Sequence, residues 1–389
     1  MSFKVKNISN SSLSIFYVKN GKNTRGTLKP GQEITADPVK TSQISFFEKN
    51  GKIKVSQGAD APTSNNDKVI TSGAIRPKKV VKKEEHLRNK MKENTNKTIN
   101  EIIEDNAIDY KKVLDDNISC IYNEMDLYDV SVIIPVRNRM RFAEPMYNSF
   151  LKAAEKSGLK IAYTVVEHSE NPDHSKFCKK NKINYMWIKS EPQELFNKCL
   201  AHNMGVFFSV KSKYILFHDI DCLMQSDFFI NLFENIKNQK AKAIQNFTGR
   251  RVLYIHTELT NKVVAGTYDV DALNISHPEI SPPKLVGAPG GSITIDRELF
   301  FEVGGYDPEL FLANSPEDAF FWQKVDIIDK MYICDTPDIE LYHMYHAPTW
   351  MNNPRIHEME AINHNFKLMS EESKKEVIQL KADMIKEYK

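Results

Sequence analysis

Two carboxylates separated by one residue, Asp219 and Asp221, follow the apolar run 214–217 and His218. Side chains alternate between the two faces of a strand, so both carboxylates project to one side where this strand ends, and both can reach one divalent cation. The carboxyl end of a strand is also where open α/β sheets bind nucleotides. Because acidic pairs are common after apolar runs, this pair indicates a metal site only together with other motifs.

A second acidic pair, Glu317 and Asp318, follows Ser315 and Pro316. The pattern is typical of a helix start, with Ser315 as the N-cap, Pro316 at the first helical position and acids in the first turn. A carboxylate is equally the group that can take a proton from an attacking hydroxyl. The residues alone leave both interpretations open, and both can hold at once.

Strand-like and helix-like segments alternate from residue 129 onward, which predicts a layered α/β architecture. Strands are expected at 131–135, 161–166, 183–188 and 214–217. A helix is expected to begin at Ser190, because Ser-Glu-Pro-Gln at 190–193 has the pattern of a capping box with proline in the first turn. This helix would bury apolar side chains between Leu195 and Phe207.

The first 57 residues have a different pattern, in which apolar and polar positions alternate between the turn dipeptides Asn-Gly at 20–21, Pro-Gly at 30–31 and Asn-Gly at 50–51. This predicts a small antiparallel β domain at 1–57. Residues 58–128 are expected to form a linker and a helical segment. Between residues 76 and 92, eight basic residues stand against two glutamates, so the linker is either a solvated tether or a docking patch for a polyanion such as DNA.

Composition limits the class of protein. The chain has 389 residues, of which 41% are hydrophobic, and a formal net charge of +2, so it has a sizeable core and no global attraction to nucleic acid or membrane. Five cysteines without a Cys-x-x-Cys pair argue against a disulfide framework and a structural zinc site. No signal peptide and no 18-residue apolar run is present, so we expect no membrane span and a cytoplasmic protein. Richness in Lys, Asn and Ile suggests a bacterial cell or a virus-infected host.

Seven motifs, taken in order, resemble those of metal-dependent glycosyltransferases with the GT-A fold, in the β-galactosyltransferase and polypeptide N-acetylgalactosaminyltransferase groups. They are Ser-Val-Ile-Ile-Pro-Val-Arg-Asn-Arg at 131–139, Phe-Asn-Lys at 196–198 with Asn-Met-Gly at 203–205, Asp-Ile-Asp at 219–221, Gly-Gly-Ser at 290–292, Gly-Gly-Tyr-Asp at 304–307, Glu-Asp at 317–318 and His-Met-Tyr-His at 343–346. The resemblance covers 129–350 and implies a GT-A fold with a mixed central sheet. Residues 351–389 would follow it as a helical tail.

The resemblance also implies which residues bind the nucleotide-sugar donor. Those expected to contact the diphosphate, the ribose or the sugar are Pro135, Arg137, Arg139, Asn197, Lys198, Asp219, Gly290 and Gly291. Arginine has the fork geometry that suits phosphate or uracil oxygens, and glycine allows the backbone to approach a sugar closely.

The resemblance makes Asp221 a direct metal ligand and His346 its partner from a distant segment, with His343 at the position where the family has methionine. Mixed oxygen and nitrogen ligands favour Mn²⁺, with Mg²⁺ as the alternative. Three-residue spacing would place His343 and His346 on opposite faces of a regular strand. Both can therefore bind one ion only if the segment turns out of the sheet.

On the acceptor side, the family's acidic pair maps to Glu317, which would bind the acceptor, and Asp318, which would act as general base. The segment 311–316 lacks the family's Trp and Gly residues, and Ala319 and Phe320 stand where two further acids are expected. The acceptor's identity therefore does not carry over.

These motifs together predict an enzyme that moves a sugar from a nucleotide-diphosphate donor, most simply a UDP-sugar, to a hydroxyl acceptor, with inversion and with Asp318 as base. One alternative is nucleotidyl transfer, which normally shows a Gly- and Lys-rich loop near the first strand that this chain lacks. The other is a non-catalytic sugar- or nucleotide-binding module of a structural assembly. Since the N-terminal segments hold no catalytic candidate, a chain beginning near Asn106 is expected to fold and to hydrolyse donor.

Overall fold

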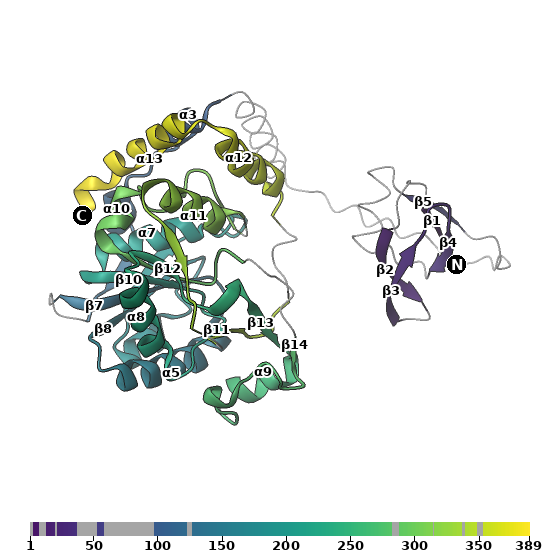
Figure 1. Cartoon of the computed structure of the whole chain (residues 1–389), viewed down its shortest axis with the longest axis horizontal. Helices are drawn as coiled ribbons and strands as arrows, with labels where there is room; N and C mark the ends of the chain where they lie inside the picture. The colour runs from purple at the N-terminus through teal and green to yellow at the C-terminus, as the bar shows by residue number, and fades with distance from the viewer. Residues whose placement is uncertain are drawn as a thin grey trace. The chain divides into compact units, whose positions relative to one another are not determined.

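The structure of the protein, a computed structural model, describes residues 3–7, 13–19, 22–36, 53–57, 97–122, 127–281, 288–313, 315–336, 339–347 and 353–389 (Figure 1). The chain divides into two compact units, residues 1–82 and 83–389. Each unit is described by itself.

The N-terminal unit contains short antiparallel strands. They are β1 (Phe3–Asn7), β2 (Leu13–Lys19), β3 (Lys22–Leu28), β4 (Glu33–Ala36) and β5 (Ile53–Gln57). β1 pairs with β4 and β5, and β2 pairs with β3. The turn dipeptides at 20–21 and 50–51 and the basic segment 76–92 lie outside the described residues, so the independent β domain and the polyanion patch stay predictions.

The large unit is built on an eight-stranded sheet in the order β16-β12-β15-β10-β7-β8-β9-β6. Its strands are β6 (Ile118–Cys120), β7 (Tyr128–Val136), β8 (Ile161–Ser169), β9 (Asn184–Lys189), β10 (Ser212–His218), β12 (Ala243–Gln245), β15 (Ser292–Asp296) and β16 (Met331–Ile333). The four strands β10, β7, β8 and β9 run parallel, whereas β15 is antiparallel to both of its neighbours. The sheet is therefore mixed, and the expected α/β architecture is confirmed.

Helices cover both faces of this sheet. They are α5 (Met140–Ser157), α6 (Ser175–Asn181), α7 (Lys198–Phe208), α8 (Phe228–Gln239), α9 (Thr257–Val264), α10 (Arg297–Glu302) and α11 (Glu317–Ile328). Figure 1 shows α7 and α11 on one side and α5 and α8 on the other, and their apolar side chains form two separate cores. α7 lies close to β7 because Gly205 has no side chain, and a Cβ there would come within 2.5 Å of Ile133 Cγ2.

A smaller sheet, β11-β17-β13-β14, brings a distant segment to the end of β10. Its strands are β11 (Cys222–Leu223), β17 (Leu341–His343), β13 (Val252–Ile255) and β14 (Ile280–Ser281). Cys222 pairs with His343, and the backbone N–H of Met344 donates to the carbonyl oxygen of Asp221 at 2.8 Å. The described residues also include the short 3-10 helices Thr248–Arg250, Val270–Ala272 and Lys386–Tyr388.

The helices that precede residue 129 and those that follow residue 350 pack in the same core as the central sheet. α3 (Ile99–Asp105), α4 (Tyr110–Asp115), α12 (Ile356–Leu368) and α13 (Glu371–Ile385) all bury apolar side chains against α7, α10 and α11. A fully buried ion pair, Lys381 Nζ to Glu309 at 2.8 Å, also joins α13 to the loop that follows Gly304 and Gly305. Residues 97–122 therefore form part of the large unit. Within the described residues, no helix has both the length and the apolar character to cross a membrane.

The helix expected from Ser190 begins eight residues later, so that prediction is wrong. Asn197 is the N-cap of α7, and its side-chain oxygen accepts a hydrogen bond from the backbone N–H of Leu200 at 2.8 Å. Its own N–H donates to His168 and its side-chain amide donates to the carbonyl oxygen of Pro308. These tertiary bonds select Asn197 as the cap, and residues 191–194 close a separate turn, in which Glu194 N–H donates to the Glu191 carbonyl.

Candidate active site

Three side chains with metal-binding chemistry meet where β10 ends. His346 Nε2 lies 3.0 Å from Asp221 Oδ2, and His343 Nε2 lies 3.6 Å from Asp221 Oδ1. One ligand atom from each of the three residues lies within 4.8 Å of the others. β17 ends at His343, and residues 344–347 leave the sheet. This turn allows both imidazoles to reach one point, as the spacing required.

His346 forms a hydrogen bond through its other ring nitrogen, Nδ1, and this bond indicates whether Nε2 is free to bind a metal. His346 Nδ1 lies 2.8 Å from the carbonyl oxygen of Ala347, which can only accept, so Nδ1 carries a proton. With the other nitrogen unprotonated, Nε2 and the Asp221 carboxylate are both acceptors, and their close approach needs a cation between them. A proton or a divalent metal fills that need. The donor set of one carboxylate and two imidazoles suits a first-row metal such as Mn²⁺.

Asp221 lies in a positively charged environment. Burial alone would raise the pKa of its carboxyl, but with protons rather than a metal on the two imidazoles, the charges of His343, His346 and Arg139 hold that pKa well below its ordinary value. Arg139 Nε lies 3.9 Å from Asp221 Oδ2. Asp221 is thus an anion over the whole physiological range, as a metal ligand must be.

Asp219 has different partners from Asp221. β10 ends at His218, and residues 219–222 form a turn in which Cys222 N–H donates to the Asp219 carbonyl at 3.0 Å. The alternation of a strand therefore does not continue through Asp219, and the group formed by Asp221, His343 and His346 does not include it. Instead, Asp219 Oδ1 lies 3.2 Å from Lys198 Nζ.

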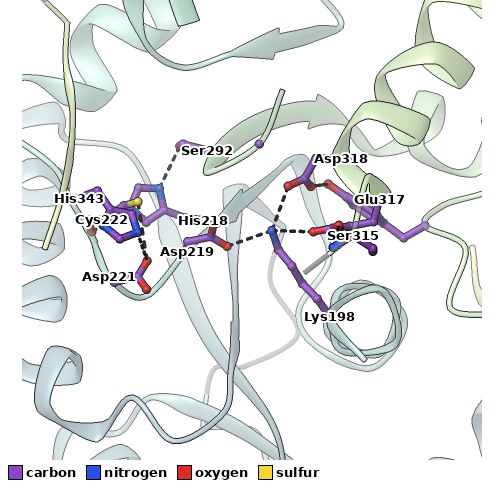
Figure 2. Close-up of polar contacts among 12 residues, drawn as sticks. Lys198, His218, Asp219, Asp221, Cys222, Ser292, Ser315, Glu317, Asp318 and His343 are labelled. Atoms are coloured by element: carbon purple, nitrogen blue, oxygen red, sulfur yellow. Dashed lines mark hydrogen bonds and ion pairs between the residues drawn. The ribbon is translucent and has the colours of Figure 1, made fainter. Parts of the chain in front are cut away.

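Lys198 is the centre of a second cluster (Figure 2). Its ammonium lies 3.2 Å from Asp219, 3.4 Å from Glu317 and 3.0 Å from Asp318. The helix α7 supplies the lysine, and α11 supplies Glu317 and Asp318 in its first turn. The cluster joins Asp219, which is close in sequence to the metal group, to Glu317 and Asp318, which are expected to act on the acceptor.

Glu317 is the most deeply buried member of this cluster. Burial and the neighbouring charge of Asp318 raise the pKa of Glu317 to about 7, although Lys198 opposes the shift. The expected role of Ser315 as N-cap is wrong. Pro316 occupies the N-cap, and the Ser315 hydroxyl instead donates to Glu317 Oε2 at 3.0 Å. Glu317 Oε2 is thus bonded within the loop that starts α11, whereas Oε1 faces Lys198.

The two glycines contact protein groups rather than open space. A Cβ on Gly290 would lie 1.9 Å from Asp318 Oδ2, and one on Gly291 would lie 2.7 Å from Leu341 Cδ2. Gly291 also has a φ of +93°, which side-chain-bearing residues rarely adopt. Its carbonyl accepts a hydrogen bond from the N–H of Asp219 at 3.0 Å. Glycine is needed at both positions because the loop passes between Asp219 and Asp318. A contact of either glycine with a sugar stays a prediction.

The remaining donor-site candidates lie at different distances from the clusters. Pro135 is inside β7, and Arg139 lies beside Asp221. Arg137 Nη1 donates to the carbonyl oxygen of Glu194 at 2.5 Å. Asn197 is the buried helix cap described above, with its polar groups bonded inside the protein. Their roles in donor binding stay predictions.

Two aromatic residues of the site were missed by the reasoning from residue types. The Tyr306 hydroxyl donates to Asp318 Oδ1 at 3.2 Å, and the Tyr254 ring packs against His343 with centroids 4.9 Å apart. The motif Gly-Gly-Tyr-Asp at 304–307 held a signal for Tyr306. Tyr254 lies on β13, which carries no motif.

A small cavity lies beside the Lys198 cluster. It has a volume of about 10 Å³ and is lined by Lys198, His202, Asp219, Tyr306 and Asp318, among others. A larger cavity of about 120 Å³, between α5 and β8, is lined by none of the site residues.

Comparisons with known proteins bear on the family of the chain. The family described as glycosyltransferase-like family 2 matches residues 131–352, which is more than half of the chain. A search of curated proteins found no match.

Three solved structures illustrate the similarity. A mutant of Drosophila β-1,4-galactosyltransferase 7 in complex with manganese, UDP-Gal and xylobiose has 16% identity and a TM-score of 0.36, with 60% of this chain and 74% of that chain covered. S. aureus TarS 1–349 in complex with UDP-GlcNAc has 14% identity and a TM-score of 0.41, with coverage of 66% and 72%. GalNAc-T7 with UDP, GalNAc and Mn²⁺ has 18% identity and a TM-score of 0.40, with coverage of 59% and 45%.

The mixed α/β sheet and the family match define a glycosyltransferase of the GT-A class. The chain belongs to glycosyltransferase-like family 2.

Proposed function

We propose that this enzyme transfers a sugar from a UDP-sugar to a hydroxyl group of an acceptor, with a divalent metal ion and with inversion at the anomeric carbon. The observation that carries the proposal is the position of Lys198, whose ammonium lies 3.2 Å from Asp219 on the metal side and 3.0 Å from Asp318 on the acceptor side. Lys198 therefore lies between the side on which the diphosphate would depart and the carboxylate that would act on the attacking hydroxyl.

On the donor side, Asp221, His343 and His346 would hold the metal. When bound, Mn²⁺ or Mg²⁺ supplies positive charge that neutralises the departing diphosphate. Arg139 lies 3.9 Å from Asp221 and Lys198 lies 3.2 Å from the neighbouring Asp219, and both of these basic side chains are largely buried. Buried cations interact with phosphate more strongly than exposed ones, because water screens them less. The choice of UDP as the nucleotide follows from the resemblance of the motifs.

On the acceptor side, Asp318 is the general base. The acceptor oxygen forms a bond to the anomeric carbon, the bond from that carbon to the diphosphate oxygen breaks, and the hydroxyl proton passes to Asp318. Glu317, with its pKa raised to about 7 by burial and by Asp318, can hold a proton near neutrality and so donate a hydrogen bond to the acceptor. Displacement in one step inverts the anomeric configuration.

A panel of UDP-sugars, assayed for hydrolysis with Mn²⁺ and with Mg²⁺, tests the proposal without knowledge of the acceptor. Asp318→Asn keeps the size of the side chain but cannot take a proton, so turnover should fall by about 100-fold or more, with Tm nearly unchanged. Asp326→Asn, an exposed position on the same helix, is the matched control and should keep wild-type turnover. Anomeric NMR of the sugar product reads the stereochemistry.

A wild-type chain that binds UDP but turns over none of the UDP-sugars would overturn the proposal in favour of a non-catalytic binding module. Wild-type turnover in Asp318→Asn would remove the general base and leave Asp318 as a residue of the helix start. A retained anomeric configuration would contradict inversion alone.

A further inference from the structure

The carboxylate of Asp318 is fixed by contacts to both of its oxygens. The Tyr306 hydroxyl donates to Oδ1 at 3.2 Å, and the Lys198 ammonium donates to Oδ2 at 3.0 Å. The backbone of Gly290 closes a third side, because a Cβ at that residue would lie 1.9 Å from Oδ2. Rotation of the carboxylate would break at least one of these contacts.

Tyr306 is itself held firmly. Its ring is stacked between Phe321, with centroids 4.2 Å apart and planes 8° apart, and His202, with centroids 4.6 Å apart and planes 25° apart. Asn203 on α7 binds the backbone of Tyr306 from both sides, since its oxygen accepts from the N–H and its amide donates to the carbonyl, each at 3.0 Å. The hydroxyl therefore projects from a preset position to Asp318.

The two donors to Asp318 differ in how they respond to a bound donor sugar. Lys198 also contacts Asp219 and Glu317, and its charge is attracted by a diphosphate, so its contact with Asp318 depends on what occupies the site. The phenol of Tyr306 carries no charge. Burial, reinforced by the neighbouring carboxylate of Asp318, raises its pKa well above the ordinary value, so it remains a proton donor throughout the range of enzyme assays.

We propose that Tyr306 is a positioning residue for the general base, whose hydroxyl keeps the Asp318 carboxylate oriented for the acceptor hydroxyl independently of Lys198. This inference rests on the proposed function, because it assigns Tyr306 a role only through Asp318. A general base must lie within hydrogen-bond reach of the proton that it takes, and small displacements of it cost large factors in rate. Loss of one hydrogen bond from an uncharged donor to a carboxylate corresponds to a decrease of about tenfold in turnover.

Tyr306→Phe removes the hydroxyl and keeps both stacking contacts. We expect kcat for hydrolysis of the best UDP-sugar to fall about tenfold, with KM for the donor changed less than about twofold and Tm close to that of wild type. Tyr163→Phe is the matched control, since Tyr163 is also buried and its hydroxyl donates to Met146 Sδ, away from the site. That variant should keep wild-type kcat.

A double-mutant cycle separates positioning from a general structural effect. In an Asp318→Asn background, adding Tyr306→Phe should change kcat by less than about twofold, because the hydroxyl then has no base to orient. Equal losses in both backgrounds would overturn the inference, as would a Tyr306→Phe variant with wild-type kcat.

Asp318→Glu provides a test that does not depend on the folding of Tyr306→Phe. It keeps a carboxylate but shifts it by one methylene, and wild-type kcat there would equally overturn the inference. A wild-type chain without turnover would remove the proposed function itself, and the role of Tyr306 with it.

Discussion

Lys198 Nζ lies 3.0 Å from Asp318 Oδ2, so an ion pair joins α7 to α11. The same ammonium contacts Asp219 and Glu317. Burial alone would lower the pKa of Lys198, but these three carboxylates outweigh it and raise that pKa well above the ordinary value. Lys198 is therefore a permanent cation, and it compensates for the concentration of acids at the site.

Lys198→Gln should destabilise the protein in a pH-dependent way. Removal of one partner from a largely buried ion pair costs roughly 3–5 kcal/mol, and the remaining carboxylates then repel each other. Without the lysine, the pKa values of Glu317 and Asp219, which burial already raises, rise further. A carboxyl with a raised pKa in the folded state adds stability at low pH and loses it as the pH rises through that pKa.

The stability deficit of Lys198→Gln should therefore be largest near about pH 7.5 and smaller near about pH 5.5. Urea denaturation at both pH values measures it. Lys198→Arg retains the charge and is the control, with a smaller deficit at either pH. A Lys198→Gln variant as stable as wild type near pH 7.5 would contradict the compensating role.

His168 should make the fold sensitive to acid. Burial, assisted by the charge of Arg137, lowers the pKa of His168 to about 4. Its Nδ1 accepts a hydrogen bond from the N–H of Asn197 at 3.0 Å, so a proton on Nδ1 would oppose the cap of α7. A histidine with a lowered folded pKa contributes stability above its unfolded pKa of about 6.5 and loses it as the pH falls towards 4, here about 3 kcal/mol.

The variant His168→Asn keeps an acceptor for the Asn197 N–H but does not titrate in this range. It should be less stable than wild type at neutral pH, because the ring is lost, and its free energy of unfolding should fall less steeply between about pH 6.5 and 4. Denaturant titrations at several pH values give both slopes. Identical slopes would show that His168 is not responsible for the acid sensitivity.

Local patterns predicted the elements that carry the site. The buried run at 131–135 corresponds to β7, and the acids after 214–217 lie at the end of β10, because a central parallel strand is apolar throughout and ends at the functional edge. The spacing of His343 and His346 correctly required a turn out of the strand.

Long-range contacts decided what local patterns left open. Whether Ser190 or Asn197 caps α7 depends on His168 and Pro308, which are distant in sequence. The placement of Lys198 among three acids likewise depends on the packing of α7 beside α11. No residue spacing encodes such contacts, so neither the partners of Asp219 nor the contact between Tyr306 and Asp318 could be read from the sequence.

The first residues of the large unit should be essential for its stability. Ile99, Ile102 and Ile103 on α3 are buried in the core, where α3 contacts α13. A chain beginning at Asn106, expected from the sequence to fold, would lose this helix, at a cost of about 1.5–3 kcal/mol for each isoleucine. A chain beginning at Lys83, where the large unit starts, should keep the Tm of the full-length protein and its donor hydrolysis.

Thermal denaturation and UDP-sugar hydrolysis of the two truncated chains check this comparison. If the chain from Asn106 is as stable as the chain from Lys83, α3 does not contribute to the core as its burial indicates. Loss of donor hydrolysis in a folded chain from Lys83 would instead place a catalytic function in the N-terminal unit.

The metal group allows a test in which the two histidines should differ. His346 is closer to Asp221, at 3.0 Å against 3.6 Å, and its second nitrogen is oriented by the carbonyl of Ala347. His343 Nδ1, by contrast, has no hydrogen-bond partner among the described residues. A hydrogen bond to the second ring nitrogen fixes the tautomer and orientation of a ligating imidazole. Loss of that bond typically lowers the affinity for the metal by roughly 10–100-fold. His346 should therefore contribute more to metal binding.

We expect chelation to abolish donor turnover and Mn²⁺ to restore it better than Mg²⁺, because imidazole ligands favour the transition metal. His346→Ala should weaken Mn²⁺ binding, measured directly by electron paramagnetic resonance, by about 10-fold or more, and His343→Ala should weaken it less. His364→Ala, at an exposed histidine on α12, is the control and should bind Mn²⁺ like wild type. Full turnover in excess chelator, or unchanged Mn²⁺ binding by His346→Ala, would show that Asp221 and the two histidines do not hold a catalytic metal.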